Sequence, residues 1–251
     1  MKNSIYQSIL NARREQRKQV AVLIDPDTFI AGKTPEMVAS SGADFIFVGG
    51  SLISHGDLEK TIALLKERCQ APIVIFPGSL LQISPTADGI LNLSLISGRN
   101  PEFLIGQHVI AAPMLRASKL EIIPTGYMLI DSGRQTTASY ISMTTPIPHD
   151  KAEIAACTAM AGEMLGLSAV YLDGGSGAME HVSEIMIKKV RENISVPLIV
   201  GGGIRDVSAA MKICKAGADL LVIGNGAQDD PALASAICST VHSFYSNYSK
   251  S

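Results

Sequence analysis

Glycines that follow short apolar segments are the residues best placed for chemistry in this chain of 251 residues. Gly201-Gly202-Gly203 follows one such segment, Gly224-Asn225-Gly226 follows the next, and similar glycines occur at 49–51 and 77–79. Without a Cβ, the backbone N–H groups of glycine can approach an anion closely, and a following helix adds a positive dipole. The glycines at 201–203 and 224–226, which follow the last two apolar segments of the chain, therefore predict a phosphate site. The alternative is that these glycines only form tight turns.

A third glycine-rich segment, 173–177, begins with an acidic residue. Asp173 follows an apolar segment directly, so it could hydrogen-bond a substrate hydroxyl or take its proton. The alternative is a helix-capping or loop residue. Tyr171 precedes Asp173 by two positions, which places both side chains on the same side of a strand. The alternative for Tyr171 is that its side chain only packs inside the barrel.

Two carboxylates, Asp25 and Asp27, end the first apolar segment. Mg²⁺ prefers oxygen ligands, keeps several waters and commonly bridges one or two carboxylates to substrate phosphates. Ser51, after the next apolar segment, could add a hydroxyl ligand. This pattern favours a magnesium site, but Asp-Pro-Asp is also ordinary turn chemistry.

The remaining nucleophiles and metal-binding side chains form no motif. The histidines show no HxH or HxxxH spacing and the cysteines no CxxC pair, which argues against a zinc site and for structural thiols in a reducing compartment. Ser176 lies in GGSGA rather than in GxSxG, so no nucleophile elbow is predicted. The histidines are His55, His108, His149, His181 and His242.

Short apolar segments alternate with longer helical patterns along the whole chain. Because the strands lack strict polar alternation, they are typical of a parallel sheet that helices cover. We therefore expect one domain, 1–251, with a (β/α)₈ TIM-barrel fold and an irregular middle in units three to five; a doubly wound open sheet is the alternative. Strands are expected at 20–24, 45–48, 73–76, 89–93, 125–130, 169–172, 197–200 and 219–223, with 138–143 pairing back as a short hairpin. Helices are expected at 35–41, 58–69, 101–115, 151–165, 179–190, 207–215 and 231–245.

Composition narrows the class of protein. The chain is 47% hydrophobic and 18% charged, with a net charge of -2, so no basic excess indicates nucleic acid as a partner. The first residues do not read as a signal peptide, and no stretch of 18 apolar residues predicts a membrane span. We expect a cytoplasmic protein.

At its predicted strand ends the sequence resembles the geranylgeranylglyceryl phosphate synthase family, which includes the heptaprenylglyceryl phosphate synthases. Single elements such as GGGIR fit many phosphate-binding barrels, whereas the combination of segments is specific and spans almost the whole chain in order. The matching segments are LIDPD at 23–27, FIFVGGS at 45–51, IVIFPGS at 73–79, YLDGGSGA at 171–178, PLIVGGGIR at 197–205 and GADLLVIGN at 217–225.

The resemblance implies a prenyltransferase of phospholipid biosynthesis. The family joins the C3 hydroxyl of sn-glycerol 1-phosphate to a prenyl diphosphate, here expected to be geranylgeranyl diphosphate, and forms homo-oligomers; brief contact with a membrane surface would release the product. By motif, Asp25 and Ser51 would bind Mg²⁺, and Asp173 and Tyr171 would be catalytic. The residues implied to bind glycerol 1-phosphate are Tyr171, Leu172, Asp173, Gly174, Gly175, Ser176, Gly177, Gly202, Gly203, Gly224 and Asn225.

One departure concerns the proposed catalytic residue. The family usually has glutamate where this chain has Asp173, which leaves open whether Asp173 acts as a base or only positions the glycerol hydroxyl. Loss of diphosphate leaves a resonance-stabilised allylic cation that hardly needs a strong base, so we expect positioning. The prenyl tail requires an apolar groove, for which the apolar and small residues of the segment 83–110 are suited; the alternative for each of these residues is ordinary barrel core.

Two other classes of function compete with this one. A phosphate-binding isomerase or lyase usually needs an acid/base pair or a Schiff-base lysine, and no lysine falls inside a predicted strand. A non-catalytic phosphate-binding barrel would not need the pair of Asp25 and Ser51.

Overall fold

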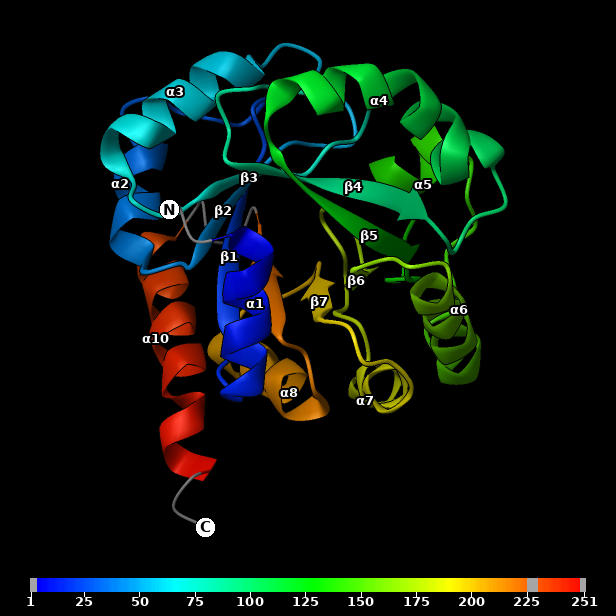
Figure 1. The fold of residues 1–251 in the computed structure, drawn as a ribbon. Helices are drawn as coiled ribbons and strands as arrows, with labels where there is room; N and C mark the ends of the chain where they lie inside the picture. The colour runs from blue at the N-terminus through cyan, green and yellow to red at the C-terminus, as the bar shows by residue number, and fades with distance from the viewer. Residues whose placement is uncertain (1–3, 225–229, 249–251) are drawn as a thin grey trace.

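The computed structural model describes residues 4–224 and 230–248. Its eight strands are all parallel and pair in sequence order, and the last pairs with the first, so the sheet is a closed barrel (Figure 1). The expected (β/α)₈ barrel is confirmed. The strands are β1 (Gln19–Ile24), β2 (Phe45–Val48), β3 (Ile73–Ile75), β4 (Gly89–Leu95), β5 (Glu121–Leu129), β6 (Ala169–Asp173), β7 (Leu198–Gly201) and β8 (Leu220–Ile223).

Helices surround this barrel on its outside (Figure 1). Several begin at a capping side chain that accepts a hydrogen bond from the first turn; Asp57, Ser183 and Asp206 do so for three of them. No described helix is long and apolar enough to cross a membrane. The helices are α1 (Ile5–Arg14), α2 (Thr34–Ser41), α3 (Leu58–Arg68), the π-helix η1 (Glu102–Gly106), α4 (Gln107–Ser118), α5 (Thr137–Ser142), α6 (Ala152–Met164), α7 (Glu184–Asn193), α8 (Val207–Ala216) and α10 (Pro231–Tyr248).

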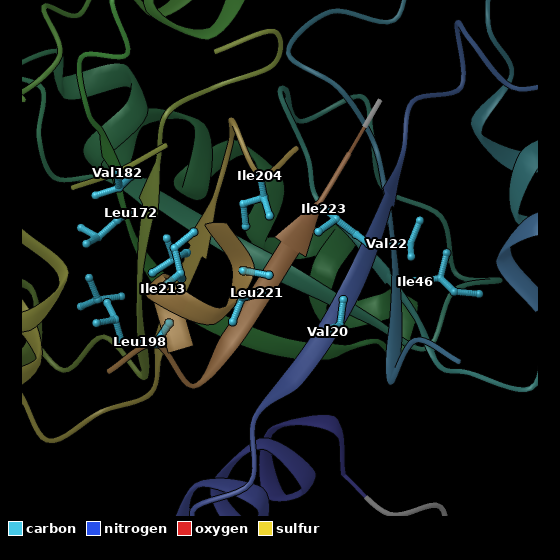
Figure 2. Close-up of a cluster of buried hydrophobic side chains, with 14 of the residues drawn as sticks. Val20, Val22, Ile46, Leu172, Val182, Leu198, Ile204, Ile213, Leu221 and Ile223 are labelled. Atoms are coloured by element: carbon cyan, nitrogen blue, oxygen red, sulfur yellow. The ribbon is translucent and has the colours of Figure 1, made fainter. Parts of the chain in front are cut away.

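The strands are buried on both faces, which explains their unbroken apolar sequences. Val20, Val22 and Ile24 of β1 pack outward against the helices, in the layer drawn in Figure 2. Ala21 between them points into the barrel, where Phe45 and Phe47 of β2 also lie. Alternate residues of each strand therefore supply two apolar layers.

Helix α1 closes the end of the barrel at which the strands begin. Ile5 and Ile9 join the inner apolar layer, and the Glu121 carboxylate accepts hydrogen bonds from the backbone N–H groups of Ile5 (2.6 Å) and Tyr6 (2.8 Å). This satisfies donors at the helix N-terminus that have no partner within the helix. The candidate functional site lies at the opposite end of the barrel, where the strands finish.

The connection between β3 and β4 departs from the regular alternation. None of residues 76–88, all of them described, is helical. An irregular middle was expected from the sequence and is confirmed. The flank of the barrel beside β3 and β4 therefore lacks the helix that covers each of the other junctions.

Two expectations for local structure were wrong. Residues 138–143 do not pair back as a hairpin but form helix α5, because Thr136 and Ser139 make a reciprocal capping box at its N-terminus. The helix expected from residue 179 begins only at Glu184, since the Ser183 hydroxyl accepts the Met186 N–H and fixes the start there.

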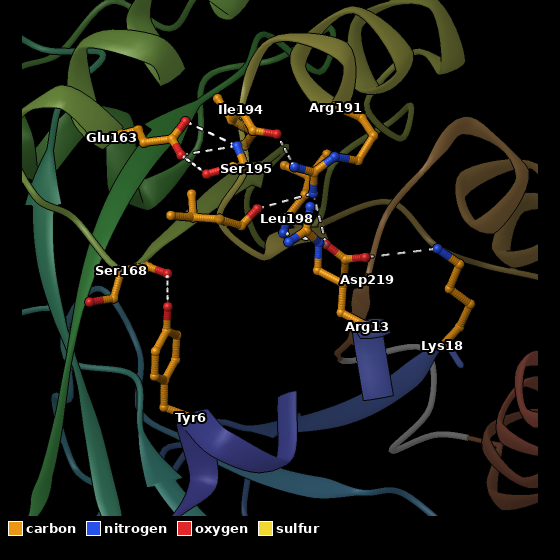
Figure 3. A network of polar contacts seen from close by, with 11 residues as sticks. Tyr6, Arg13, Lys18, Glu163, Ser168, Arg191, Ile194, Ser195, Leu198 and Asp219 are labelled. Atoms are coloured by element: carbon orange, nitrogen blue, oxygen red, sulfur yellow. Dashed lines mark hydrogen bonds and ion pairs between the residues drawn. The ribbon is translucent and has the colours of Figure 1, made fainter. Parts of the chain in front are cut away.

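Aspartates at the starts of three strands bind the neighbouring strands at the same end as α1. The carboxylates of Asp44, Asp88 and Asp219 each accept a hydrogen bond from a backbone N–H at the start of the preceding strand, at 2.8–2.9 Å. Asp219 is in addition 2.9 Å from the Arg191 guanidinium and 3.9 Å from the Lys18 ammonium (Figure 3). Burial lowers the pKa of Lys18 and of Arg191, while Asp219 opposes that shift in both.

Asp219→Ala should lower the free energy of unfolding by about 3–5 kcal/mol, because it leaves buried cations without their partner. Chemical denaturation measures this loss. The matched control is Glu192→Ala, which removes an exposed ion pair with Lys188 and should cost less than about 0.5 kcal/mol. Equal losses in the two variants would contradict a stabilising role for Asp219.

Candidate functional site

The loops after β6 and β7 pack against each other at the mouth of the barrel. The Gly174 N–H donates to the Gly201 carbonyl at 3.0 Å. Gly202 has a φ of 81°, and a Cβ there would lie 2.7 Å from the Gly175 nitrogen. Gly203 has a φ of 71°, so both residues occupy the left-handed region that favours glycine. These glycines are required by the contact between the two loops.

The loop after β8 begins beside this contact. β7 and β8 are neighbours in the barrel, with Gly201 in register with Val222. Gly224 follows β8, and a Cβ on it would meet no atom within 4 Å. The backbone at Gly224 therefore borders open space. Asn225, also predicted to bind phosphate, lies outside the described residues.

Asp173 is buried at the end of β6, directly below these loops, with an exposed fraction of 6%. Its Oδ2 accepts a hydrogen bond from the Tyr127 hydroxyl at 2.5 Å, and its Oδ1 accepts one from the Gly175 N–H at 2.7 Å. Burial raises the pKa of Asp173, whereas these two hydrogen bonds lower it. The carboxylate is thus held in one orientation by two donors.

Tyr127 is a site residue that the sequence did not reveal. It lies in β5 in register with Tyr171 of β6. The rings of Phe76, Tyr127 and Tyr171 form a cluster with centroids 5.3–5.7 Å apart. Burial raises the pKa of both tyrosines, and the neighbouring Asp173 raises it further. Only the strand register, which sequence patterns do not fix, places Tyr127 beside Asp173.

The other predicted residues of the loop after β6 point in different directions. The Leu172 side chain packs in the outer apolar layer, away from the mouth, so only its backbone could reach a ligand. Ser176 and Gly177 are exposed, and Gly177 has a φ of 72°. A Cβ on Gly177 would collide with the Arg134 guanidinium. Glycine at 177 therefore lets Arg134 lie over this loop.

The two aspartates after β1 have different environments. Asp25 is half-buried, and its carboxyl lies against Gly50, where a Cβ would be 3.1 Å from Oδ2. Its Oδ1 accepts the Asp27 N–H at 3.0 Å, and burial raises its pKa.

The Asp27 carboxylate instead binds the loop after β2. It accepts hydrogen bonds from the backbone N–H groups of Ser54, His55 and Gly56 and from the Ser54 hydroxyl, at 2.6–3.1 Å. These donors hold its pKa well below the usual range. Asp25 thus remains at the mouth beside Gly50, the residue before Ser51, while Asp27 joins two loops.

An apolar cavity lies between the β3–β4 connection and α4. Gly50, Ser51 and Tyr127 form part of its wall. Residues from the apolar segment 83–110 supply much of its lining. Among the lining residues are Leu80, Ile83, Leu93, Leu95, Phe103 and Ala111.

Comparisons with known proteins extend these observations. A family model described as the PcrB family matches residues 11–241. Geranylgeranylglyceryl phosphate synthase of Chitinophaga pinensis is 50% identical over 245 residues, 96% of this chain and 97% of that protein. The protein of that name from Pyrococcus furiosus is 40% identical over 228 residues, 89% and 90% of the two chains.

A solved structure is similar over the same length. It is (S)-3-O-geranylgeranylglyceryl phosphate synthase from Thermoplasma acidophilum in complex with the substrate sn-glycerol-1-phosphate. Its TM-score is 0.87 at 33% identity, and the match covers 95% of this chain and 98% of that one.

The closed barrel, with polar loops gathered at one mouth, defines a (β/α)₈-barrel enzyme. The chain belongs to the PcrB family, and it is a prenyltransferase. The resemblance to the geranylgeranylglyceryl phosphate synthases is thereby confirmed.

Gly202→Ala should disrupt the contact between the loops after β6 and β7. Its Cβ would strike the Gly174 and Gly175 backbone in addition to the strain of a positive φ. We expect a loss of about 2–4 kcal/mol in unfolding free energy, measured by chemical denaturation. The control is Gly166→Ala, where φ is 88° but no atom lies within 4 Å, and strain alone should cost about 1–2 kcal/mol. Similar losses in both variants would show that the loop contact adds nothing.

Proposed function

We propose that the chain transfers a long prenyl group from its diphosphate to the C3 hydroxyl of sn-glycerol 1-phosphate, forming an ether and releasing diphosphate. The observation that carries this proposal is an apolar cavity beside Gly50, Ser51 and Gly78, at the same end of the barrel as the glycine loops after β6 and β7. The names of the relatives and the bound glycerol phosphate of the Thermoplasma acidophilum enzyme support it. Geranylgeranyl diphosphate is the first donor to test.

The acceptor would lie at the ends of β6, β7 and β8. Its phosphate would face the backbone of Gly202, Gly203 and Gly224. Gly202 and Gly203 pack closely on the loop after β6, whereas Gly224 borders open space. The sequence motif places Asn225 in the same role. Neutral backbone donors explain how an anion could be held here without a cluster of lysines.

Asp173 would orient the glycerol hydroxyl. Tyr127 and Gly175 each occupy one of its oxygens, and each oxygen keeps acceptor capacity for a further hydrogen bond. A carboxylate held in this way can accept the hydroxyl proton as a hydrogen bond and fix the direction of the oxygen lone pair.

The donor would place its tail in the apolar cavity and its diphosphate near Asp25 and Ser51. Among the described residues, no three His, Cys, Asp or Glu side chains lie close enough together to hold a metal ion. One carboxylate and one hydroxyl, completed by water and diphosphate oxygens, still suit Mg²⁺. Bound there, Mg²⁺ would neutralise charge that develops on the leaving diphosphate.

The reaction requires the bond between the prenyl C1 and the diphosphate oxygen to break. The electron pair leaves with diphosphate, and the remaining allylic cation is stabilised by resonance. The acceptor oxygen held by Asp173 then forms the new C–O bond, and its proton passes to the released diphosphate. The apolar lining and the aromatic cluster would keep water away from the cation.

Asp25→Ala should abolish prenyl transfer while glycerol phosphate binding and the fold survive. The test follows radiolabelled sn-glycerol 1-phosphate into lipid with geranylgeranyl diphosphate, with Mg²⁺ and with EDTA. Asp27→Asn is the comparison variant, since Asp27 joins loops rather than facing the mouth. Transfer that withstands EDTA, or a near-normal rate in Asp25→Ala, would refute the magnesium assignment.

Asp173→Asn separates positioning from base catalysis. A positioning role predicts a higher KM for glycerol phosphate and a kcat reduced less than about 100-fold. A general base would instead supply roughly 10²–10⁴-fold. Steady-state kinetics at several pH values measures both constants. A kcat that falls by more than about 10³-fold with KM unchanged would contradict positioning.

A further inference from the structure

The β3–β4 connection contains a buried glutamine, Gln82. Gln82 has an exposed fraction of 4%. Its Oε1 accepts hydrogen bonds from the N–H groups of Gly50 (3.3 Å) and Gly78 (3.2 Å), and its Nε2 donates to the Gly50 carbonyl at 2.8 Å. A single side-chain amide therefore joins the loop after β2 to the loop after β3.

These two loops surround Ser51. A Cβ on Gly78 would lie 2.3 Å from the Gly50 carbonyl oxygen and 2.6 Å from the Ser51 Cα, so the two backbones are in direct contact. Gly50 also lies against the Asp25 carboxyl. The hydrogen bonds of Gln82 thus fix the backbone on both sides of Ser51 and opposite Asp25.

The same hydrogen bonds leave fewer backbone N–H groups in these two loops available to bind an anion. The N–H groups of Gly50 and Gly78 are directed to Gln82, and the Gly49 N–H donates to the Ile24 carbonyl at 3.0 Å. Glycines at 49–51 and 77–79 suggest anion-binding amides from sequence, but these three donors are used within the protein. An anion at this side of the mouth would depend on the groups around Asp25 and Ser51.

We infer that Gln82 is a positioning residue for the donor end of the site, where it takes the place of the missing β3–β4 helix in holding Ser51 opposite Asp25. The inference rests on the proposed function, in which the donor diphosphate lies at these two residues. It assigns no contact between Gln82 and a substrate. Its effect should therefore appear at the donor end and leave the acceptor loops, on the opposite side of the mouth, unchanged.

Gln82→Met removes all three hydrogen bonds at similar volume. We expect the dissociation constant for inorganic pyrophosphate with Mg²⁺, measured by calorimetry, and the KM for geranylgeranyl diphosphate to rise about tenfold. The dissociation constant for sn-glycerol 1-phosphate should stay within about twofold. Gln19→Met is the matched control, because Gln19 is equally buried at 4% but lies at the start of β1, at the closed end of the barrel.

A purely structural role would give a different result. It predicts that Gln82→Met and Gln19→Met both lower the melting temperature and leave the pyrophosphate affinity unchanged, which would overturn the inference. An equal loss of affinity for pyrophosphate and glycerol phosphate would overturn it as well. If Gln82→Met does not fold, Gln82→Asn replaces it, since its amide is too short to reach both loops, and the same selective loss is expected.

The binding measurements also keep this inference separate from the proposed function. If the wild-type protein binds pyrophosphate with Mg²⁺ but transfers no prenyl group, the proposed function fails, and the selective loss in Gln82→Met still supports the role of Gln82. If the wild-type protein transfers the prenyl group and Gln82→Met binds pyrophosphate normally, only the inference fails.

Discussion

The contact between the loops after β6 and β7 is the constraint on which the mouth of this barrel depends. The Gly202 backbone lies where a Cβ would meet the nitrogens of Gly174 and Gly175. Within the loop after β6, the Gly175 N–H donates to Asp173 at the end of the strand. The same approach brings the backbone of two loops to one place, where side chains would otherwise separate them. A glycerol phosphate site at this place, as proposed, would be lined mainly by backbone atoms.

The other half of the mouth is organised by side chains. Asp27 ties the loop after β2 to the loop after β1, and Gln82 ties it to the loop after β3. The β3–β4 connection has no helix, and an apolar cavity lies between it and α4. Hydrogen bonds to the side chains of Asp27 and Gln82 join these loops instead. The two halves of the mouth are therefore held together by different contacts, backbone packing in one half and side-chain hydrogen bonds in the other.

Much of the fold could be predicted from the sequence because unbroken apolar strands require burial on both faces. The position of Asp25 at the mouth also followed, since residues that end parallel strands share one edge. The different roles of Asp25 and Asp27 did not follow, because they depend on hydrogen bonds to Ser54, His55 and Gly56. Tyr127 was missed for a related reason: its partnership with Asp173 arises from strand register. Leu172 fits the binding motif by position, but its side chain faces the helices.

Helix α1 seals the end of the barrel at which the strands begin. A barrel closed at one end admits molecules from the other end only, so both substrates of the proposed reaction would enter where the strands finish. In the proposed reaction, the cavity between the β3–β4 connection and α4 would hold the hydrocarbon away from the loops after β6 and β7.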